Sequence, residues 1–411
     1  MQTPKTLSSE QILAIQNQLL QGVLSSRAPT DILQEFYQEL STGGLHIYRA
    51  VIGCLTLHPV FGSFEFQWTL ESQQVKCVTF PRQAIASENF QNTPFYYLAT
   101  HQNLINSLHI NLQKGIDRPW FPLFDRLRSE GMTDYLAFFT SYVIQFYIPD
   151  LTVPPGIAVS FTTDSSTGFT IEQCDTIKKL FPSVCMVVKY HSFSIGLTDV
   201  LATYVGQRTS KRILSGEIDR GSLQSIRSII WFGDLRGFTR LSDTTPPQIV
   251  VECLNIYLEC VSRPVIKRGG EVLKYMGDGV LAFFELEEQI SETINLALEA
   301  ANETFKNLQT LNQQRQIAGE IILEFDLVLH IGSVLYGNVG AIERLDFTVI
   351  GPAVNEASRM ESLCDKLNCH LLLSDAFVSQ LNQGSYSIKS LGFHQLRGVN
   401  QPKEIFTLCL D

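Results

Sequence analysis

The sequence lacks an excess of positive charge, and this limits the partners that it is expected to bind. Its 411 residues include 31 Lys and Arg against 41 Asp and Glu, which gives a net charge of −10 and a pI of about 5.4. Neither a nucleic-acid backbone nor an anionic membrane surface is expected as a partner for such a chain. An acidic protein that binds a polyphosphate also needs metal ions and local Lys or Arg side chains to offset the repulsion.

Paired cysteines, a long apolar run and a leader pattern are also missing. The nine cysteines are scattered, and Cys364 and Cys369 have no second pair with which to form a zinc site. The longest apolar stretch, Tyr135 to Ile148, is interrupted by Thr, Ser and Gln, which predicts buried strands rather than a membrane span. No basic start leads into an apolar stretch near Met1, so no secretory signal is expected. These absences predict reduced thiols in a cytoplasmic protein.

The chain does have the length and apolar content for more than one domain. With 411 residues, of which 45% are hydrophobic, it is expected to fold as two or three parts. The patterns divide it into an N-terminal domain at residues 1–190, a helical connector at 191–221 and a C-terminal domain at 222–411.

The N-terminal domain combines helical and strand-like patterns. Apolar residues at helical spacing predict a helical region from Ser8 to Leu40, and another helix begins near Phe169. The strand-like segments are His46–Leu57, Ser63–Leu70, Val75–Phe80, Tyr135–Phe139, Val143–Pro149 and Gly156–Thr162. This order predicts an α+β domain.

Residues 30–190 resemble a GAF domain, chiefly through the apolar strand Gly156–Thr162 and the Gly168-Phe-Thr helix start that follows it. The resemblance implies a regulatory domain with an unidentified ligand, and a packing or dimerisation module without a ligand is the alternative. In the connector, Thr198–Leu214 is expected to be helical, and it either pairs with its twin in a dimer or packs on its own domain.

Two short motifs in the C-terminal domain each place an aspartate after an apolar run and beside glycine. They are Trp231-Phe-Gly-Asp234-Leu-Arg-Gly and Lys274-Tyr-Met-Gly-Asp278-Gly. A carboxylate at the end of a buried strand is costly unless a cation or hydrogen bonds satisfy it. Two ordinary turn aspartates or a divalent-metal site that handles a polyphosphate both fit this pattern. Backbone N–H groups of the loop that reaches Phe238 and Thr239 are candidates for holding phosphate oxygens.

The elements around these motifs predict a ferredoxin-like βαββαβ core with its helices on one face. The expected elements, in order, are strand Ile226–Phe232, helix Pro246–Arg268, strand Val272–Met276, strand Val280–Phe284, helix Glu287 to about Gln313 and strand Phe325–Ile331. Adjacent strands in this sheet are expected to bring Asp234 and Asp278 within reach of the same metal ions.

A third cluster runs from Asp346 through Thr348 and Asn355 to Arg359. A strand is expected to end at Gly351, and a helix follows it. Asn355 and Arg359 are four residues apart, so they project from one helical face. An amide and a guanidinium side by side suit a ribose and a phosphorane, although a plain polar helix face would look the same.

These three clusters, together with Gly332-Ser-Val-Leu-Tyr-Gly-Asn-Val-Gly340 and Leu396-Arg-Gly-Val-Asn-Gln-Pro-Lys-Glu-Ile-Phe406, resemble class III nucleotide cyclases over about residues 221–408. The resemblance implies that Asp234 and Asp278 bind two Mg²⁺ or Mn²⁺ ions per active site, with the Leu235 carbonyl as an extra ligand. It implies that Asn355 orients the ribose and that Arg359 stabilises the transition state.

The resemblance also makes Lys274 and Thr348 the base-selecting pair, and it assigns terminal phosphates to Arg344. Lys274 can donate to N1 of adenine, and the Thr348 hydroxyl can accept from N6. Guanine would leave unpaired donors in the same site, so ATP is the expected substrate and cyclic AMP the product. Threonine at position 348 resembles the subgroup of soluble cyclases in which bicarbonate stimulation is common, so bicarbonate is a candidate activator.

Active sites of this family lie between two catalytic domains, one giving the aspartates and the other the Lys/Thr pair, Asn and Arg. A chain with one such domain and all six residues is therefore expected to be a homodimer with two equivalent sites. The alternatives are a nucleotide-binding pseudoenzyme that signals by dimerisation and a guanylate cyclase.

Overall fold

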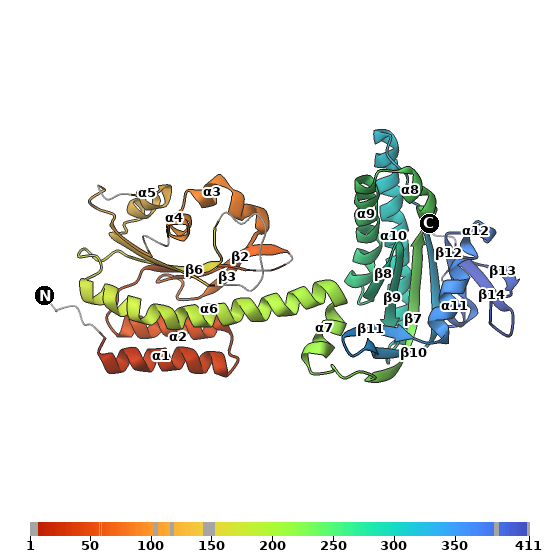
Figure 1. Ribbon diagram of the computed structural model, residues 1–411, viewed down its shortest axis with the longest axis horizontal. Coiled ribbons are helices and arrows are strands. Elements are labelled where there is room, and N and C mark those ends of the chain that lie inside the picture. Colours follow the sequence, from red (N-terminus) through yellow and green to blue (C-terminus); the bar gives the residue numbers. More distant parts are fainter. Residues whose placement is uncertain are drawn as a thin grey trace. The chain divides into compact units, whose positions relative to one another are not determined.

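A computed structural model of the protein describes residues 7–56, 58, 60–101, 106–115, 119–142, 153–381 and 386–408. The chain divides into two compact units, Met1–Val200 and Leu201–Asp411 (Figure 1). The strand expected at Val143–Pro149 lies outside the described residues.

An antiparallel sheet forms the centre of the N-terminal unit, with the strand order β3-β2-β1-β6-β5-β4. Its strands are β1 (Arg49–Leu55), β2 (Phe61–Thr69), β3 (Lys76–Pro81), β4 (Ser107–Asn111), β5 (Asp134–Ser141) and β6 (Gly156–Thr163). The helices are α1 (Ser9–Leu24), α2 (Pro29–Thr42), η1 (Arg82–Ala86), α3 (Glu88–Gln91), α4 (Pro94–Thr100), α5 (Pro122–Ser129) and α6 (Ile171–Val205). The α+β prediction for this unit is confirmed.

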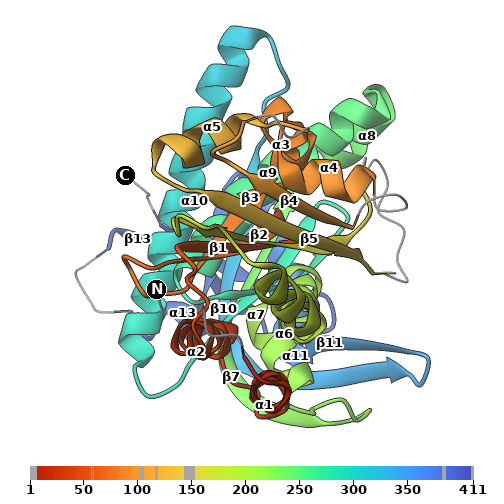
Figure 2. The ribbon, with the colours of Figure 1, turned by 90° about the vertical axis from the view of Figure 1, so that its left-hand side faces the viewer.

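The two faces of this sheet carry different side chains because successive strand residues point in opposite directions. One face, with Ile52, Phe66 and Phe161, packs against α1, α2 and α6. The other face, with Tyr135 and Phe139, packs beneath the side of the unit that holds α4 and α5. Figure 2 shows the sheet between these two groups of helices.

The helical region expected from Ser8 to Leu40 is two helices rather than one. The chain turns after α1, where Ser26 has a φ of 52°, and Pro29 begins α2. Proline suits the first position of a helix because its missing N–H would have no partner there.

The connector also differs from its prediction. Helix α6 continues past residue 190 to Val205, and the compact units divide between Val200 and Leu201. The helix expected at Thr198–Leu214 is interrupted at Gly206, whose φ of 90° precedes α7 (Gln207–Leu214). A residue with a side chain would be strained in that conformation, so glycine permits the break.

Helix α6 is the one helix of the described chain with the length and apolar composition of a membrane span. Its first half is buried in the N-terminal unit, where Ile177, Leu180 and Val188 belong to the core. Core helices of globular proteins can have the same length and apolar composition, so α6 gives only weak support for a membrane span.

The C-terminal unit is built on a sheet with the strand order β13-β14-β12-β10-β7-β9-β8, and β11 pairs with β10. Its strands are β7 (Leu223–Leu235), β8 (Glu271–Met276), β9 (Gly279–Glu285), β10 (Phe325–Ala341), β11 (Arg344–Ile350), β12 (Leu371–Ser374), β13 (Ile388–His394) and β14 (Lys403–Leu408). Its helices, after α7, are α8 (Phe238–Thr244), α9 (Pro247–Lys267), α10 (Ile290–Ala318), α11 (Pro352–Glu361), α12 (Cys364–Leu367) and α13 (Asp375–Val378).

The predicted βαββαβ core is confirmed as β7, α9, β8, β9, α10 and β10, with antiparallel pairing between neighbouring strands. Helices α9 and α10 cover one face of the sheet, as expected, and α11 lies on the other (Figure 1). Ile230, Phe232 and Asp234 alternate along β7, and Ile230 belongs to the core on the α11 side. The Asp234 side chain therefore points to the α11 face of the sheet.

Candidate active site

Asp234 and Asp278 lie at the same end of the sheet because their strands are neighbours. Asp234 is the next-to-last residue of β7, and Asp278 lies in the turn between β8 and β9. The turn is tight, and Gly277 adopts a φ of 71° within it. The register pairs Gly233 with Val280, and both aspartates lie just beyond this pair at the same end of the ladder. The structure thus brings these two predicted metal ligands together.

Their proximity changes the acidity of Asp234. Its pKa is raised to about 8, first by burial and then by a hydrogen bond with Asp278 and the charge of that carboxylate. Glu361, at the end of α11, adds a smaller repulsion. Two carboxyl groups that share a proton in this way form a site that a divalent cation stabilises, because the cation replaces the proton and removes the repulsion. Oxygen ligands of this kind fit Mg²⁺ or Mn²⁺.

A cation at this pair would need further oxygen ligands. No group of three or more His, Cys, Asp or Glu side chains within the described residues is arranged to hold a metal ion. Mg²⁺ commonly uses one or two carboxylates and fills its remaining positions with water and phosphate oxygens. The Leu235 N–H donates to Oδ1 of Asp234 at 3.0 Å, which orients that carboxylate. Cys364 and Cys369, for which the sequence predicts no zinc site, are free thiols.

Binding of Mn²⁺ to the metal-free protein is expected to strengthen as the pH rises, because the cation must displace the proton that Asp234 holds. The apparent affinity should rise roughly tenfold per pH unit up to about pH 8 and then level off.

The same raised pKa of Asp234 makes the metal-free fold lose stability as the pH rises towards about 8, since the folded state keeps a proton that the unfolded state has released. Calorimetric titrations with Mn²⁺ at several pH values measure the metal affinity, and thermal unfolding in EDTA measures the stability.

Asp278→Asn tests the effect of the neighbouring carboxylate on the pKa of Asp234, because it removes that charge and keeps the shape of the side chain. Its thermal unfolding in EDTA at pH 8 should occur at a higher temperature than that of the native protein. An affinity of the native protein for Mn²⁺ that does not change between pH 6 and pH 8 would contradict the shared proton.

A buried network beside Asp234 was not foreseen in the sequence. Asp326 is the cross-strand partner of Asp234 and is only 3% exposed. It accepts from Nε of Arg236 at 2.8 Å, and its other oxygen lies 2.8 Å from Nδ1 of His370. Arg236 also pairs with Asp365 at 3.2 Å. This network compensates a third carboxylate next to the Asp234–Asp278 pair and anchors the chain immediately after Asp234.

Lys274 lies on β8 and forms an ion pair with Asp346 of β11. Its strand contains a bulge between Val272 and Lys274, which disturbs the alternation of side chains in front of the turn. Asp346 and Thr348 are two residues apart on β11, so their side chains point to the same side of that strand. The structure thus places Lys274 on the face of β11 that carries the Thr348 side chain, with Asp346 as an acidic neighbour that the sequence did not reveal as a partner.

Asn355 and Arg359 project from one side of α11, one helical turn apart. In the described part of the chain, neither side chain forms a hydrogen bond or an ion pair within the protein. The Arg359 guanidinium lies over Gly398, where an added Cβ would come within 3.5 Å of Nη1. Both groups are therefore available to a ligand.

The remaining predicted residues lie at loop ends. Phe238 and Thr239 open the short helix α8 directly after Gly237, whose φ is 75°. The Phe238 side chain packs against the core, and Thr239 is exposed. Arg344 is exposed at the start of β11, where it pairs with Ala341 across the hairpin. Hydrogen bonds and ion pairs of the described residues do not join Arg344, Lys274, Asn355 or Arg359 to the aspartate pair.

Comparison with known proteins finds similarity over the C-terminal unit. Residues 223–410 match the family model of the adenylate and guanylate cyclase catalytic domain. An adenylate cyclase of Anabaena cylindrica is 33% identical over 169 residues, which are 40% of this chain and 33% of that protein. Adenylate cyclase 1 of Rhizobium meliloti is 27% identical over 175 residues, which are 43% of this chain and 26% of that protein. The chain thus spans about a third or less of the length of these relatives.

Solved structures of both nucleotide specificities are similar to part of the chain. The adenylyl cyclase CyaB from P. aeruginosa is 28% identical, with a TM-score of 0.42 over 46% of this chain and 96% of that one. The guanylyl cyclase Cya2 is also 28% identical, with a TM-score of 0.40 over 45% of this chain and 93% of that one. Residues 223–410 are thus similar to the catalytic domain of adenylate and guanylate cyclases.

Proposed function

We propose that this protein is an adenylate cyclase, which converts ATP to 3′,5′-cyclic AMP and pyrophosphate at sites shared by two copies of the chain. The observation that carries the proposal is the Asp234–Asp278 pair, within a domain that matches the cyclase family. Its carboxylate oxygens suit divalent metal ions, and the pKa of Asp234 is raised by burial and by the neighbouring Asp278. Bound Mg²⁺ or Mn²⁺ would lower the pKa of the ribose 3′-hydroxyl and offset the charge of the triphosphate.

The other residues would then bind and orient ATP. Asn355 would hold the ribose so that its 3′-hydroxyl faces the α-phosphorus in line with the leaving pyrophosphate. Arg359 would donate to the α-phosphoryl oxygens as their charge grows. The Leu235 carbonyl would add a metal ligand, the backbone N–H groups at Phe238 and Thr239 would hold phosphate oxygens, and Arg344 would approach the terminal phosphates.

Base selection would fall to Lys274 and Thr348. The Lys274 ammonium can donate to N1 of adenine, and the Thr348 hydroxyl can accept from N6. Asp346 supports this role, because its ion pair directs the Lys274 side chain towards β11. A guanine in the same position would place its N1–H against the ammonium, and a buried mismatch of donors is strongly disfavoured.

Two copies of the chain would complete each site. Within the described residues, the aspartate pair and the Asn355–Arg359 pair share no direct contact in one chain, and the side chains of Asn355 and Arg359 have no protein partner. Apolar side chains on β8, α9 and β11 are also exposed, as expected for a surface that a second copy covers. They are Ile266 (55% exposed), Tyr275 (50%), Met276 (42%), Leu345 (38%) and Ile350 (42%).

Helix α6 carries a second exposed apolar stripe. Met186, Tyr190, Phe193 and Leu197 follow one another at spacings of four, three and four residues, and each is 46–67% exposed. This is the a/d spacing of a coiled coil, so the stripe suits pairing with the α6 helix of another copy. We therefore extend the homodimer proposal to this part of α6, which precedes the segment Thr198–Leu214 for which helix pairing was expected.

Replacing Phe193 and Leu197 by glutamate is expected to weaken the dimer at least about tenfold, because charges in a coiled-coil seam are poorly solvated. Ser194→Glu is the matched control, since Ser194 is exposed next to the stripe and outside the a/d spacing. Sedimentation equilibrium measures the dissociation constant of the dimer for the double variant and for Ser194→Glu. A double variant that dimerises like Ser194→Glu would exclude α6 from the interface.

The N-terminal unit is proposed to be a GAF-like regulatory domain that changes the cyclase activity in response to a ligand. Bicarbonate stimulation and a cytoplasmic location also remain proposals, and both rest on the sequence. A bicarbonate titration of the purified protein at constant pH tests the first, and an unchanged rate would exclude it.

Incubation of the purified protein with ATP and Mg²⁺ or Mn²⁺ tests the proposed activity. Mass spectrometry should find 3′,5′-cyclic AMP and pyrophosphate in equal amounts. Binding of ATP without turnover by a verified dimer would instead identify a pseudoenzyme, for which no described residue gives support, because both aspartates, Asn355 and Arg359 are present.

A further inference from the structure

One face of the N-terminal sheet is unusually polar for a surface that helices cover. Along β2 the residues alternate strictly, and Phe64, Phe66 and Trp68 fill the core on the α6 side. Glu65 and Gln67 point to the opposite face, which packs beneath α4 and α5. Such alternation is typical of a sheet with one face in water. Polar side chains beneath a helical cover indicate a cavity that is suited to a polar group.

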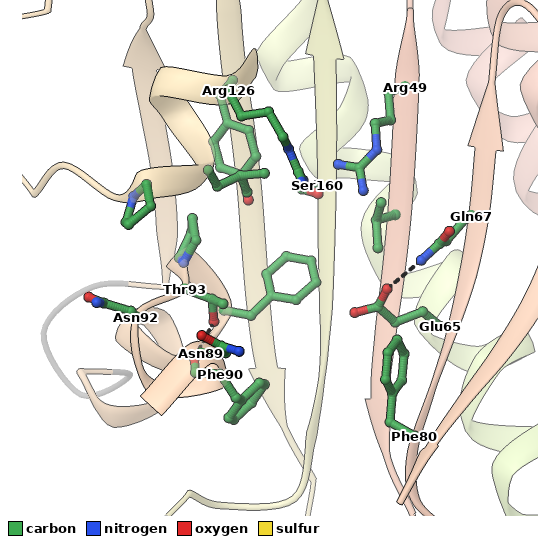
Figure 3. Close-up of a pocket in the computed structure, with 16 residues that line it drawn as sticks. Arg49, Glu65, Gln67, Phe80, Asn89, Phe90, Asn92, Thr93, Arg126 and Ser160 are labelled. Atoms are coloured by element: carbon green, nitrogen blue, oxygen red, sulfur yellow. Dashed lines mark hydrogen bonds between the residues drawn. The ribbon is translucent and has the colours of Figure 1, made fainter. Parts of the chain in front are cut away.

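A cavity of about 700 Å³ lies at this position, within the size range of small-molecule sites. Its floor is formed by β1, β2, β5 and β6, and its other walls come from α3, α4 and α5 (Figure 3). The lining contains two arginines, Arg49 of β1 and Arg126 of α5, and one acid, Glu65. These charges leave a net charge of +1 in the cavity.

The two arginines converge on one end. Figure 3 shows the Arg49 and Arg126 side chains reaching from opposite sides towards Ser160. Burial of the Arg49 guanidinium lowers its pKa, which is the cost of removing a cation from water. Glu65 accepts a hydrogen bond from Nε2 of Gln67 at 2.7 Å, and Arg126 pairs only loosely with Glu130, at 3.9 Å. Within the described chain Arg49 has no ion-pair partner, so an anion from outside would satisfy it.

The other end of the cavity is rich in aromatic rings, with Glu65 and Asn89 beside them. Phe80, Phe90 and Phe95 line it, and they also line an adjoining cavity of about 380 Å³. That second cavity continues along the sheet between apolar side chains such as Leu55 and Phe139. The two hollows together offer a cationic end for a charged group and an apolar end for a body of several carbon atoms.

We propose that this cavity binds a small organic monoanion, a carboxylate with an aromatic or aliphatic body. The carboxylate lies between Arg49 and Arg126, next to Ser160, and the body extends along Phe95 and Phe90. Arginine is suited to this task because its planar guanidinium binds a carboxylate through two parallel hydrogen bonds. The net charge of +1 favours a monoanion over a phosphate dianion.

The test is calorimetric titration of the full chain with 4-phenylbutyrate and octanoate, and with the matched neutral alcohols 4-phenylbutan-1-ol and octan-1-ol. At least one of the two acids is expected to bind with a Kd below about 1 mM and at least about tenfold more tightly than its alcohol. The binding needs no metal or nucleotide, so the result is independent of the cyclase activity.

Arg49→Gln and Arg126→Gln should each weaken the acid at least about tenfold, which is typical of a lost charge-assisted hydrogen bond. Arg128→Gln is the matched control, because Arg128 is exposed on the same helix as Arg126 and does not line the cavity. Arg126 is itself exposed, so its replacement tests the site even where Arg49→Gln disturbs folding. Absence of binding by both acids, equal binding of acid and alcohol, or equal weakening by Arg128→Gln would each overturn the proposal.

Discussion

Cyclase activity is expected to return when two inactive variants, Asp278→Ala and Arg359→Ala, are combined. Each variant alone should lose at least about 10²–10³-fold in rate, because one lacks a metal carboxylate and the other the donor to the transition state. In a mixed dimer, one site takes its aspartates from the Arg359→Ala chain and its arginine from the Asp278→Ala chain. That site is intact and the other carries both defects. Random pairing should therefore restore roughly a quarter of the native activity.

Asp234→Ala combined with Asp278→Ala is the matched control. Both replacements affect the same half of the site, so every dimer of these chains has two defective sites and no activity should return. Formation of mixed dimers is verified with two affinity tags before the rates are measured. Sites contained within single chains would give no recovery in either mixture, and that outcome would contradict the shared site.

Lys274→Glu is expected to shift the preference between ATP and GTP by at least about 10³-fold, since mismatched hydrogen-bonding groups in a buried site discriminate by up to about 10⁵. A carboxylate accepts hydrogen bonds, so it would lose the contact to N1 of adenine and would instead accept from N1–H of guanine. The ratio of kcat/KM for the two nucleotides measures the shift. Turnover of ATP should fall even if turnover of GTP stays low.

Asp346→Asn separates base recognition from general damage to this region. It removes the ion pair with Lys274 but leaves the ammonium in place, so the preference for ATP should persist while the KM rises. A Lys274→Glu variant that keeps the native preference would show that other residues select the base.

The order of elements in the C-terminal unit could be predicted because its local signals agree. Proline at the start of α9, the Gly-Asp-Gly turn between β8 and β9, and the periodic apolar residues of α9 and α10 all favour the βαββαβ arrangement that the structure has. The predicted Gly-Asp-Gly turn also puts Asp278 at the end of a hairpin whose second strand pairs with the strand of Asp234.

The contacts that depend on register between distant strands could not be predicted. Asp326 meets Asp234 only through the pairing of β10 with β7, and Lys274 meets Asp346 across 72 residues of sequence. The bulge before Lys274 also invalidates a simple count of strand positions back from Asp278. The sequence did contain a signal that Asp326 has a partner. It is the second residue of the apolar strand Phe325–Ile331, where an aspartate without a partner is costly.

The N-terminal unit was less predictable because its helices are short or merge into longer ones. Helix α3 spans only Glu88–Gln91, too few residues to show a helical period, so the cover over the polar face of β2 left no clear signal. Helix α6 has apolar residues on both its buried and its exposed side, so the periodic pattern marked no end at the expected domain boundary.

The most direct test of the central claim is the turnover of ATP and GTP present together at equal concentration, with Mg²⁺ and then with Mn²⁺. Quantitative mass spectrometry of cyclic AMP and cyclic GMP against isotope-labelled standards gives the ratio of kcat/KM for the two nucleotides. An adenylate cyclase that selects its base through Lys274 and Thr348 should form cyclic AMP in at least about hundredfold excess with either metal. Cyclic GMP in equal or greater amount would contradict the account.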